Sequence, residues 1–128
     1  MTHTIISADR VQQTDGWINK YIFPNGELPY MKDLLTSASP FLVTEDIQSF
    51  AKSYAKTLHE WNARFQANYN KIKDNYDHQQ DGKFYRMWSF YLGICEGSFL
   101  ARTSQLTQIV HSKFTREEEY YSVRDQRI

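Results

Sequence analysis

The most regular pattern in this sequence is a stripe of large apolar side chains that begins just after Ser53. Its members are spaced three or four residues apart: Tyr54, Leu58, Trp61, Phe65, Tyr69, Ile72 and Tyr76. An α-helix turns once in about 3.6 residues, so this spacing predicts a long amphipathic helix from Ser53 to Tyr76. A second stripe of the same kind follows: Phe84, Met87, Trp88, Tyr91, Leu92, Cys95 and Phe99. It predicts another long helix from Lys83 to about Thr103, with a connecting loop over residues 75–82.

Two shorter helices are predicted nearer the amino terminus. Apolar residues at helical spacing favour a helix from Ala8 to Phe23, which Ser7 or Asp9 could cap. Pro24 ends this helix, because proline has no amide hydrogen and restricts the residue before it. A further apolar face predicts a helix from Met31 to Ser39.

Three segments with β-branched or mixed apolar residues predict strands: Thr4–Ile6, Phe41–Phe50 and Gln105–Phe114. A fixed turn is expected at 24–29, because Asn25 and Gly26 tolerate positive φ. These elements predict an α+β fold of two long and two shorter helices beside a small, mostly antiparallel sheet. Residues 1–114 form the expected folded unit, and the charged residues 115–128 are expected to be a frayed or disordered tail.

Length and charge narrow the function classes. The 128 residues suit one domain, and the 15 basic and 15 acidic side chains cancel, so no overall field would attract nucleic acid. Cys95 is the single cysteine, which excludes an internal disulfide. The first residues do not resemble a leader peptide, and no apolar run approaches the roughly 20 residues of a membrane span. We therefore expect a cytoplasmic protein that meets the inner face of the membrane only peripherally.

Aromatic side chains are the one compositional excess, at 16% of the residues. Many of them fall on the two helical stripes. They predict either an aromatic-rich core or a groove for a flat or long apolar ligand, and composition does not separate the two.

Several short stretches, taken in order, resemble one enzyme family. They are Tyr21–Pro24, Thr57–Leu58, Trp61, Arg64–Phe65, Asp74–Tyr76, Arg86–Trp88, Tyr91–Leu92, Cys95, Gln105–Leu106 and Ser112–Lys113. Together they resemble the carboxyl-terminal portion of the cyclopropane-fatty-acyl-phospholipid synthases. Members of this family are S-adenosylmethionine-dependent methyltransferases that add a methylene bridge across the cis double bond of a membrane lipid chain.

The resemblance implies a fold, and it implies that the cofactor-binding segment of that fold is missing from this sequence. It places the three strands at one edge of a methyltransferase sheet, with the last strand inserted between its two predecessors. The family holds S-adenosylmethionine in a glycine-rich turn after its first strand, and these 128 residues contain no such turn. We therefore expect this chain alone to bind no cofactor, although the complete family enzyme uses S-adenosylmethionine and bicarbonate.

The resemblance also implies site residues. Tyr54 matches a family tyrosine that helps to hold bicarbonate, and a phenol can donate a hydrogen bond to an anion while its ring faces lipid. The alternative is that Tyr54 only packs in the helical stripe. Bulky residues that match the wall of the family's acyl-chain channel are Phe23, Trp61, Phe65, Trp88 and Tyr91, and their alternative role is to hold the helices together.

Other reactive residue types show no pattern of a site. The four histidines, His3, His59, His78 and His111, lack metal-ligand spacing and are expected to be solvated or core residues. Cys95 is expected to be a small buried hydrophobe, as free cysteines usually are. No metal site is predicted.

Three functions remain open from the sequence. The chain could be a remnant of a cyclopropane synthase, inactive alone; a subunit of a split methyltransferase; or a noncatalytic lipid-binding or self-associating protein. An uncovered sheet edge predicts a dimer or strand exchange under the first and third, and a complementary methyltransferase half under the second. A phospholipid at the membrane surface is the candidate small-molecule partner.

Overall fold

The computed structural model describes residues 1–76 and 81–122. Its elements in chain order are β1 (Thr2–Ser7), β2 (Gln12–Gln13), α1 (Gly16–Tyr21), β3 (Glu27–Leu28), α2 (Met31–Ala38), β4 (Leu42–Ser49), α3 (Ala51–Tyr76), α4 (Lys83–Leu100) and β5 (Ser104–Lys113). This succession confirms the α+β class with two long and two shorter helices. The loop predicted at 75–82 falls partly on residues 77–80, which lie outside the described residues.

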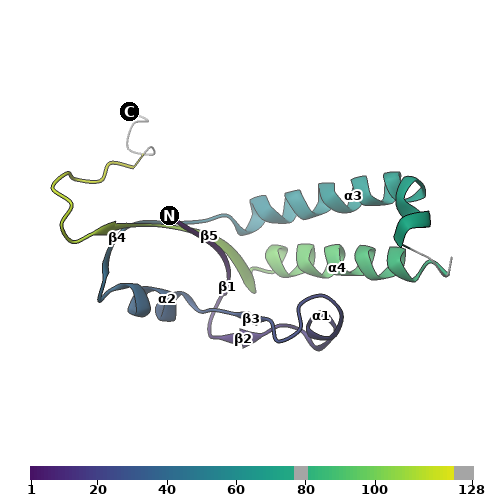
Figure 1. The fold of residues 1–128 in the computed structure, drawn as a ribbon, viewed down its shortest axis with the longest axis horizontal. Coiled ribbons are helices and arrows are strands. Elements are labelled where there is room, and N and C mark those ends of the chain that lie inside the picture. The colour runs from purple at the N-terminus through teal and green to yellow at the C-terminus, as the bar shows by residue number, and fades with distance from the viewer. Residues whose placement is uncertain (77–80, 123–128) are drawn as a thin grey trace.

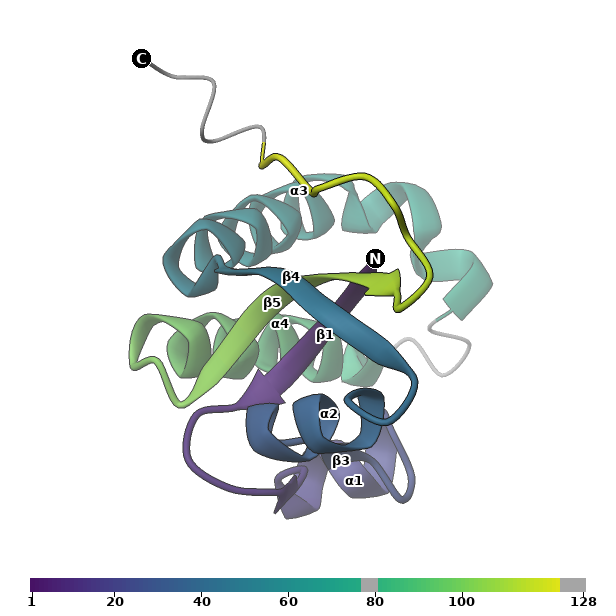
Figure 2. The ribbon, with the colours of Figure 1, turned by 90° about the vertical axis from the view of Figure 1, so that its left-hand side faces the viewer.

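The main sheet has three strands in the order β1-β5-β4, and both pairings are antiparallel. The last strand of the sequence is the central one: β5 pairs with β1 over residues 104–109 and with β4 over residues 107–113. This confirms the predicted insertion of the final strand between its two predecessors. Figure 2 shows the sheet in front of the two long helices.

Helices α3 and α4 form a hairpin that extends away from the sheet, with α1 and α2 below (Figure 1). The principal core lies at the base of this hairpin and contains Ala51, Ala55, Leu58, Leu92, Phe99 and Leu106. Because Leu106 belongs to β5, this core joins the hairpin to the sheet. No helix in the described part of the chain is long and apolar enough to cross a bilayer.

The helix predicted from Ala8 to Phe23 is wrong over its first half. Residues 12–13 form the short strand β2, which pairs with β3, and α1 begins only at Gly16. The segment before Gly16 is mostly polar, and its one large apolar residue, Val11, is exposed. It therefore has no apolar face that burial in a helix would stabilise.

The predicted cap of that helix is also wrong. Asp15 is the N-cap, and its Oδ1 accepts a hydrogen bond from the Trp17 amide at 2.8 Å. Ser7 instead lies at the end of β1, where its amide donates to the Pro29 carbonyl at 3.0 Å. The Ser7 hydroxyl donates to the Asp9 carboxylate at 3.4 Å, so these two residues interact with each other rather than with a helix.

The first part of the turn predicted at 24–29 forms after α1, whereas Glu27 and Leu28 belong to strand β3. The Gly26 amide donates to the Phe23 carbonyl at 2.9 Å, and Asn25 adopts a φ of 60°. A Cβ on Gly26 would lie 2.9 Å from the same carbonyl oxygen, so glycine is needed at this position. The turn fixes the direction in which Phe23 leaves α1.

The carboxyl-terminal region differs from the prediction at two points. Helix α4 ends at Leu100, before the expected Thr103, because Arg102 has a φ of 61° that no helix can continue. The part of the predicted tail that the structure describes, residues 115–122, has no helix or strand, but it returns to the sheet. Ser122 is buried, and its hydroxyl donates to the Asp46 carboxylate of β4 at 3.4 Å.

Candidate functional site

An apolar groove of about 560 Å³ runs between α3, α4, β1 and the end of α1. It is lined by Ile5, Tyr21, Ile22, Phe23, Tyr54, Leu58, Trp61, Phe84, Met87, Trp88, Tyr91, Leu92, Cys95 and Phe99. The structure thus brings together five of the six site residues predicted from the sequence: Phe23, Tyr54, Trp61, Trp88 and Tyr91. The inner stripes of both long helices supply most of the lining, so the same periodicity that builds the helices also builds the groove.

The groove walls are held by edge-to-face aromatic contacts. The Tyr54 ring lies 4.9 Å from Phe99 and 6.1 Å from Trp61, and the Tyr91 ring lies 5.6 Å from Trp88 and 6.1 Å from Phe23. Such contacts stabilise a ring beyond the free energy of its burial. Lining a channel and holding the helices together are therefore compatible roles for these residues. The rings that pack between the helices also leave an apolar surface facing the groove.

Phe65, the sixth predicted residue, lies elsewhere. It stacks on Tyr85 at 5.7 Å and contacts Tyr69 and Phe84 edge to face, nearer the tip of the hairpin. It is not among the residues that line the groove. Its partner Phe84 lines the groove, so Phe65 contacts the lining without being part of it, and packing between α3 and α4 accounts for its contacts.

The polar atoms in the groove are two phenols and a thiol. Burial, followed by the nearby Cys95, raises the pKa of Tyr54 above 10.0, and burial with interactions from Cys95 and Tyr54 raises the pKa of Tyr91 to about 12. Burial also raises the pKa of Cys95 above 9.0, although a hydrogen bond with Tyr91 opposes this. All three groups are therefore uncharged near neutral pH, as an apolar ligand requires. Cys95 is half-buried and has the character of a small hydrophobe rather than a nucleophile.

Tyr54 also lines a smaller, more open pocket of about 230 Å³ on its other side. The lining residues are His3, Phe50, Ser53, Tyr54, Thr57, Leu106 and Gln108. The Gln108 side-chain amide lies 3.1 Å from His3 Nδ1 and can only donate to it, so the proton of a neutral imidazole lies on Nε2. The pocket therefore places His3 and Tyr54, two residues whose side chains carry hydrogen-bond donors, around one small space.

His3 was missed by the sequence analysis. It lies on β1, about 50 residues before Tyr54 on α3, so no local spacing connects the two. The pairing of β1 with β5, which places His3 opposite Gln108, brings it to the pocket. The alternation of side chains along β1 could have indicated its position. Ile5 faces the core cluster, and His3, two residues away on the same strand, must lie on the same face of the sheet.

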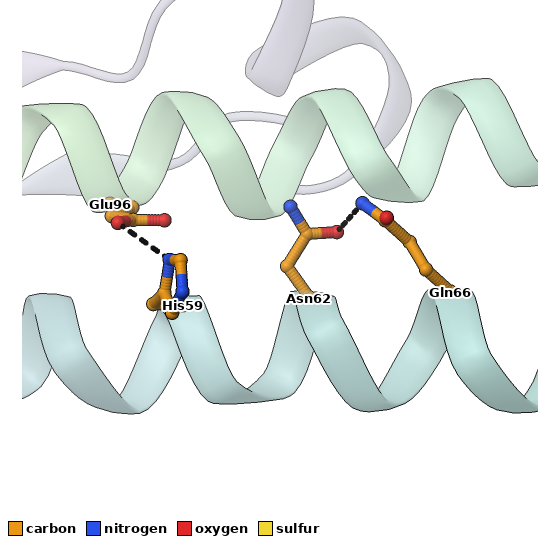
Figure 3. A network of polar contacts seen from close by, with 4 residues as sticks. All are labelled: His59, Asn62, Gln66 and Glu96. Carbon is orange, nitrogen blue, oxygen red and sulfur yellow. Dashed lines mark hydrogen bonds and ion pairs between the residues drawn. The ribbon is translucent and has the colours of Figure 1, made fainter.

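The other histidines form no shared site. His59 Nδ1 lies 3.2 Å from Oε1 of Glu96, an exposed ion pair between α3 and α4 that stands beside an Asn62–Gln66 hydrogen bond (Figure 3). His111 Nδ1 lies 3.4 Å from the Thr44 hydroxyl, and His78 lies outside the described residues. Over residues 1–76 and 81–122, no three His, Cys, Asp or Glu side chains are grouped to hold a metal ion.

The glycines of the described residues do not form a glycine-rich turn between a strand and a helix. Gly93 and Gly97 lie inside α4, Gly82 precedes it, Gly26 closes the turn after α1, and Gly16 begins α1. The glycine-rich turn that holds such a cofactor places several glycines between one strand and the following helix. No strand of this chain is followed by that arrangement in the described ranges.

Comparison with known proteins identifies relatives of most of the chain. A model of the mycolic acid cyclopropane synthetase family matches residues 1–109. Over 113 residues the chain is 43% identical to the cyclopropane-fatty-acyl-phospholipid synthase of Escherichia coli (strain K12), a match that covers 88% of this chain and 28% of that protein. It is 37% identical over 102 residues to the tuberculostearic acid methyltransferase UfaA1 of Mycobacterium tuberculosis, covering 77% of this chain and 22% of that protein.

Solved structures agree with the sequence matches. The mycolic acid cyclopropane synthase CmaA1, crystallised with SAH and CTAB, superposes with a TM-score of 0.72 at 26% identity, over 87% of this chain and 42% of that one. The cyclopropane synthase MmaA2 of Mycobacterium tuberculosis has a TM-score of 0.73 at 23% identity over the same shares, which shows a common fold. The chain thus spans less than half of each of these four relatives. Because the family model covers most of its residues, the chain belongs to the mycolic acid cyclopropane synthetase family.

Proposed function

We propose that this chain forms the lipid-binding part of a cyclopropane synthase, which holds the unsaturated acyl chain of a phospholipid while a methylene group is transferred from S-adenosylmethionine. The observation that carries the proposal is the position of Tyr54, whose side chain lines both the apolar groove and the pocket beside His3. An acyl chain in the groove would pass directly beside a site built for a small anion.

The pocket beside His3 suits bicarbonate. The phenol of Tyr54 and Nε2–H of His3 would donate to its oxygens, and the Gln108 amide holds the imidazole in the tautomer that this requires. Bicarbonate bound there would supply the base that accepts the proton lost on ring closure. Tyr54 itself does not serve as that base, because its raised pKa keeps the phenol protonated at neutral pH.

We propose further that the 128 residues alone do not turn over substrate, and that a separate methyltransferase half supplies the cofactor site. Two observations support this proposal. The glycines of the described residues do not form a cofactor-binding turn, and the outer edge of the sheet could pair with a strand from another chain. Strand β1 is an edge strand, and on its outer side the described residues give it only an isolated bridge between Ser7 and Tyr30. An edge that presents unpaired amide and carbonyl groups favours addition of another strand.

Calorimetric titration of the purified chain with oleoyl lysophosphatidylglycerol, below its micelle concentration, tests the lipid part of the proposal. Trp88→Ala removes a groove wall and should weaken binding about tenfold. Trp17→Ala is the matched control, because Trp17 contacts Tyr21 and Phe90 and does not line the groove. Equal affinity of the two variants, or no binding by the wild type, would contradict the groove assignment.

Titration with S-adenosylmethionine tests the cofactor part separately. The expected result is no saturable heat with the chain alone. Stoichiometric binding by this chain would show that it holds the cofactor without a complementary half. If lipid binds and no methyltransferase half restores turnover, the noncatalytic lipid-binding alternative is favoured instead.

A further inference from the structure

A second cavity, of about 570 Å³, adjoins the groove along α4. It lies between the end of β1, the segment leading into α1 and the carboxyl-terminal end of α4. Five residues line both spaces: Ile5, Phe23, Tyr91, Cys95 and Phe99. An elongated ligand that enters the groove can therefore continue into this cavity past an apolar boundary.

Two arginines distinguish the second cavity from the groove. Arg10, just after β1, and Arg102, just after α4, both line it and both are exposed to solvent. Within the described part of the chain, neither guanidinium has a hydrogen-bond or ion-pair partner. An apolar space with two unpaired guanidinium groups at its solvent side matches a molecule with an apolar chain and an anionic head.

Two carboxylates also line this cavity, but both already have donors. Asp15 accepts the Trp17 amide as the cap of α1, at 2.8 Å, and Asp9 accepts the Ser7 hydroxyl at 3.4 Å. Neither carboxylate forms an ion pair with Arg10 or Arg102. The two carboxylates keep their charge, so the formal charges of the lining cancel, but the unpaired donors that a ligand could meet belong to the two guanidinium groups.

The backbone at Arg102 gives a second, independent indication. The Thr103 amide donates to Ser98 O at 3.0 Å and the Arg102 amide to Phe99 O at 3.2 Å, which together form a Schellman motif. Arg102 occupies the left-handed position of that motif, with φ at 61°, where glycine would be free of steric cost. Strain retained at a residue that lines a cavity motivates a functional hypothesis. The structural alternative is that the cation only stabilises the helix carboxyl terminus.

We propose that Arg10 and Arg102 bind the phosphate of the lipid headgroup whose acyl chain lies in the groove. This inference rests on the proposed function, since it assigns the headgroup end of the same ligand. Guanidinium groups suit the task because they present paired N–H donors to phosphate oxygens.

Calorimetry of the full chain with octyl phosphate, octanol and inorganic phosphate tests the proposal. Octyl phosphate should bind about tenfold more tightly than octanol, and inorganic phosphate alone should bind weakly. Arg10→Gln and Arg102→Gly should each reduce the affinity for octyl phosphate about tenfold and leave that for octanol unchanged. Arg64→Gln, which removes an exposed arginine of α3 that lines neither space, is the matched control.

Arg102→Gly separates binding from helix stability, because glycine relieves the left-handed strain. Its melting temperature should be equal to or above that of the wild type while affinity for octyl phosphate falls. Equal binding of octyl phosphate and octanol, or unchanged binding by both arginine variants, overturns the headgroup site and leaves the groove intact. Tight binding of inorganic phosphate without gain from the chain indicates a free-phosphate site and also overturns it. Failure of both alkyl ligands rejects the groove together with the headgroup site.

Discussion

The two roles considered for Tyr54, packing and anion binding, belong to different parts of its side chain. The ring packs on Phe99 and Trp61, whereas the hydroxyl is the part that we propose binds an anion together with His3. A substitution that removes only the hydroxyl should therefore separate packing from binding.

We expect Tyr54→Phe to change the free energy of unfolding by less than about 1 kcal/mol, because the ring contacts remain. Tyr54→Ala should cost about 2 to 3 kcal/mol, since it leaves a cavity beside Phe99. Urea unfolding measures both values. In an NMR titration with bicarbonate, the imidazole signals of His3 should shift in the wild type and not in Tyr54→Phe. Equal shifts in the two proteins would exclude a role for the phenol.

Alkaline pH should destabilise the protein through the buried acids of the groove. The pKa of Cys95 is raised above 9.0, and that of Tyr91 is raised from 10.0 to about 12. The folded state then binds more protons than the unfolded state, so this stability is complete below about pH 9 and falls as the pH rises toward 12. Cys95→Ala should move the start of the decline upward, toward the range where tyrosine ionises. Denaturant unfolding between about pH 7 and 11 measures the effect, and a flat profile would contradict it.

Most of the residue-level site follows a helical period, whereas Phe23, which lies after α1, was predicted from the family resemblance alone. Tyr54, Trp61, Trp88 and Tyr91 lie on stripes that the sequence displays, and the groove forms where those stripes meet. His3 and Gln108 come from two strands at opposite ends of the chain, and only their antiparallel register brings them together. The positions of Arg10 and Arg102 at the second cavity likewise depend on where β1 and α4 end, which the sequence pattern did not define.

At the scale of the elements, the pairing of α3 with α4 depends on the base of the hairpin. Leu58 is 3% exposed in the core, whereas the neighbouring His59 is on the outside, where its exposed ion pair with Glu96 contributes little. Leu58→Ala should reduce the free energy of unfolding by about 3 kcal/mol. His59→Ala should reduce it by less than about 0.5 kcal/mol. Thermal or urea unfolding of the pair tests this contrast, and a similar loss in both variants would be inconsistent with it.

Elements with a long apolar period were predicted well, and those fixed by distant pairing were not. Helices α3 and α4 begin and end close to their expected positions, because their own sequence defines the buried face. The segment before α1 was assigned to a helix, yet Gln12 and Gln13 pair with Glu27 and Leu28 across the turn at Asn25. Hydrogen bonds made by the backbone of a polar segment leave no trace in its hydrophobic pattern.

At the scale of the whole molecule, the outer edge of β1 predicts association. The Ser7 amide faces outward to Pro29 and the Ala8 amide faces inward to Thr103, so by alternation the His3 amide also faces the open edge. We expect the chain alone to self-associate through this edge, with a mass above that of the monomer in light scattering.

His3→Pro should shift that equilibrium toward monomer, because proline removes the outward amide and is tolerated on edge strands. His3→Thr is its control, since threonine retains the amide and suits a strand. A wild-type protein that is monomeric at high concentration, or a proline variant that associates as strongly as the threonine variant, would count against edge pairing.

The central position of β5 has a consequence for biosynthesis. His3 and Gln108 touch across the sheet although 105 positions separate them, and β1 and β4 contact β5 rather than each other. On the ribosome, neither early strand can find its partner until nearly all of these residues have emerged. The hairpin of α3 and α4 has local contacts, so it can form before the strands of the sheet pair. The sheet of the nascent chain therefore cannot form before β5 has been synthesised. Until then β1 and β4 are unpaired, and they can bind chaperones or aggregate.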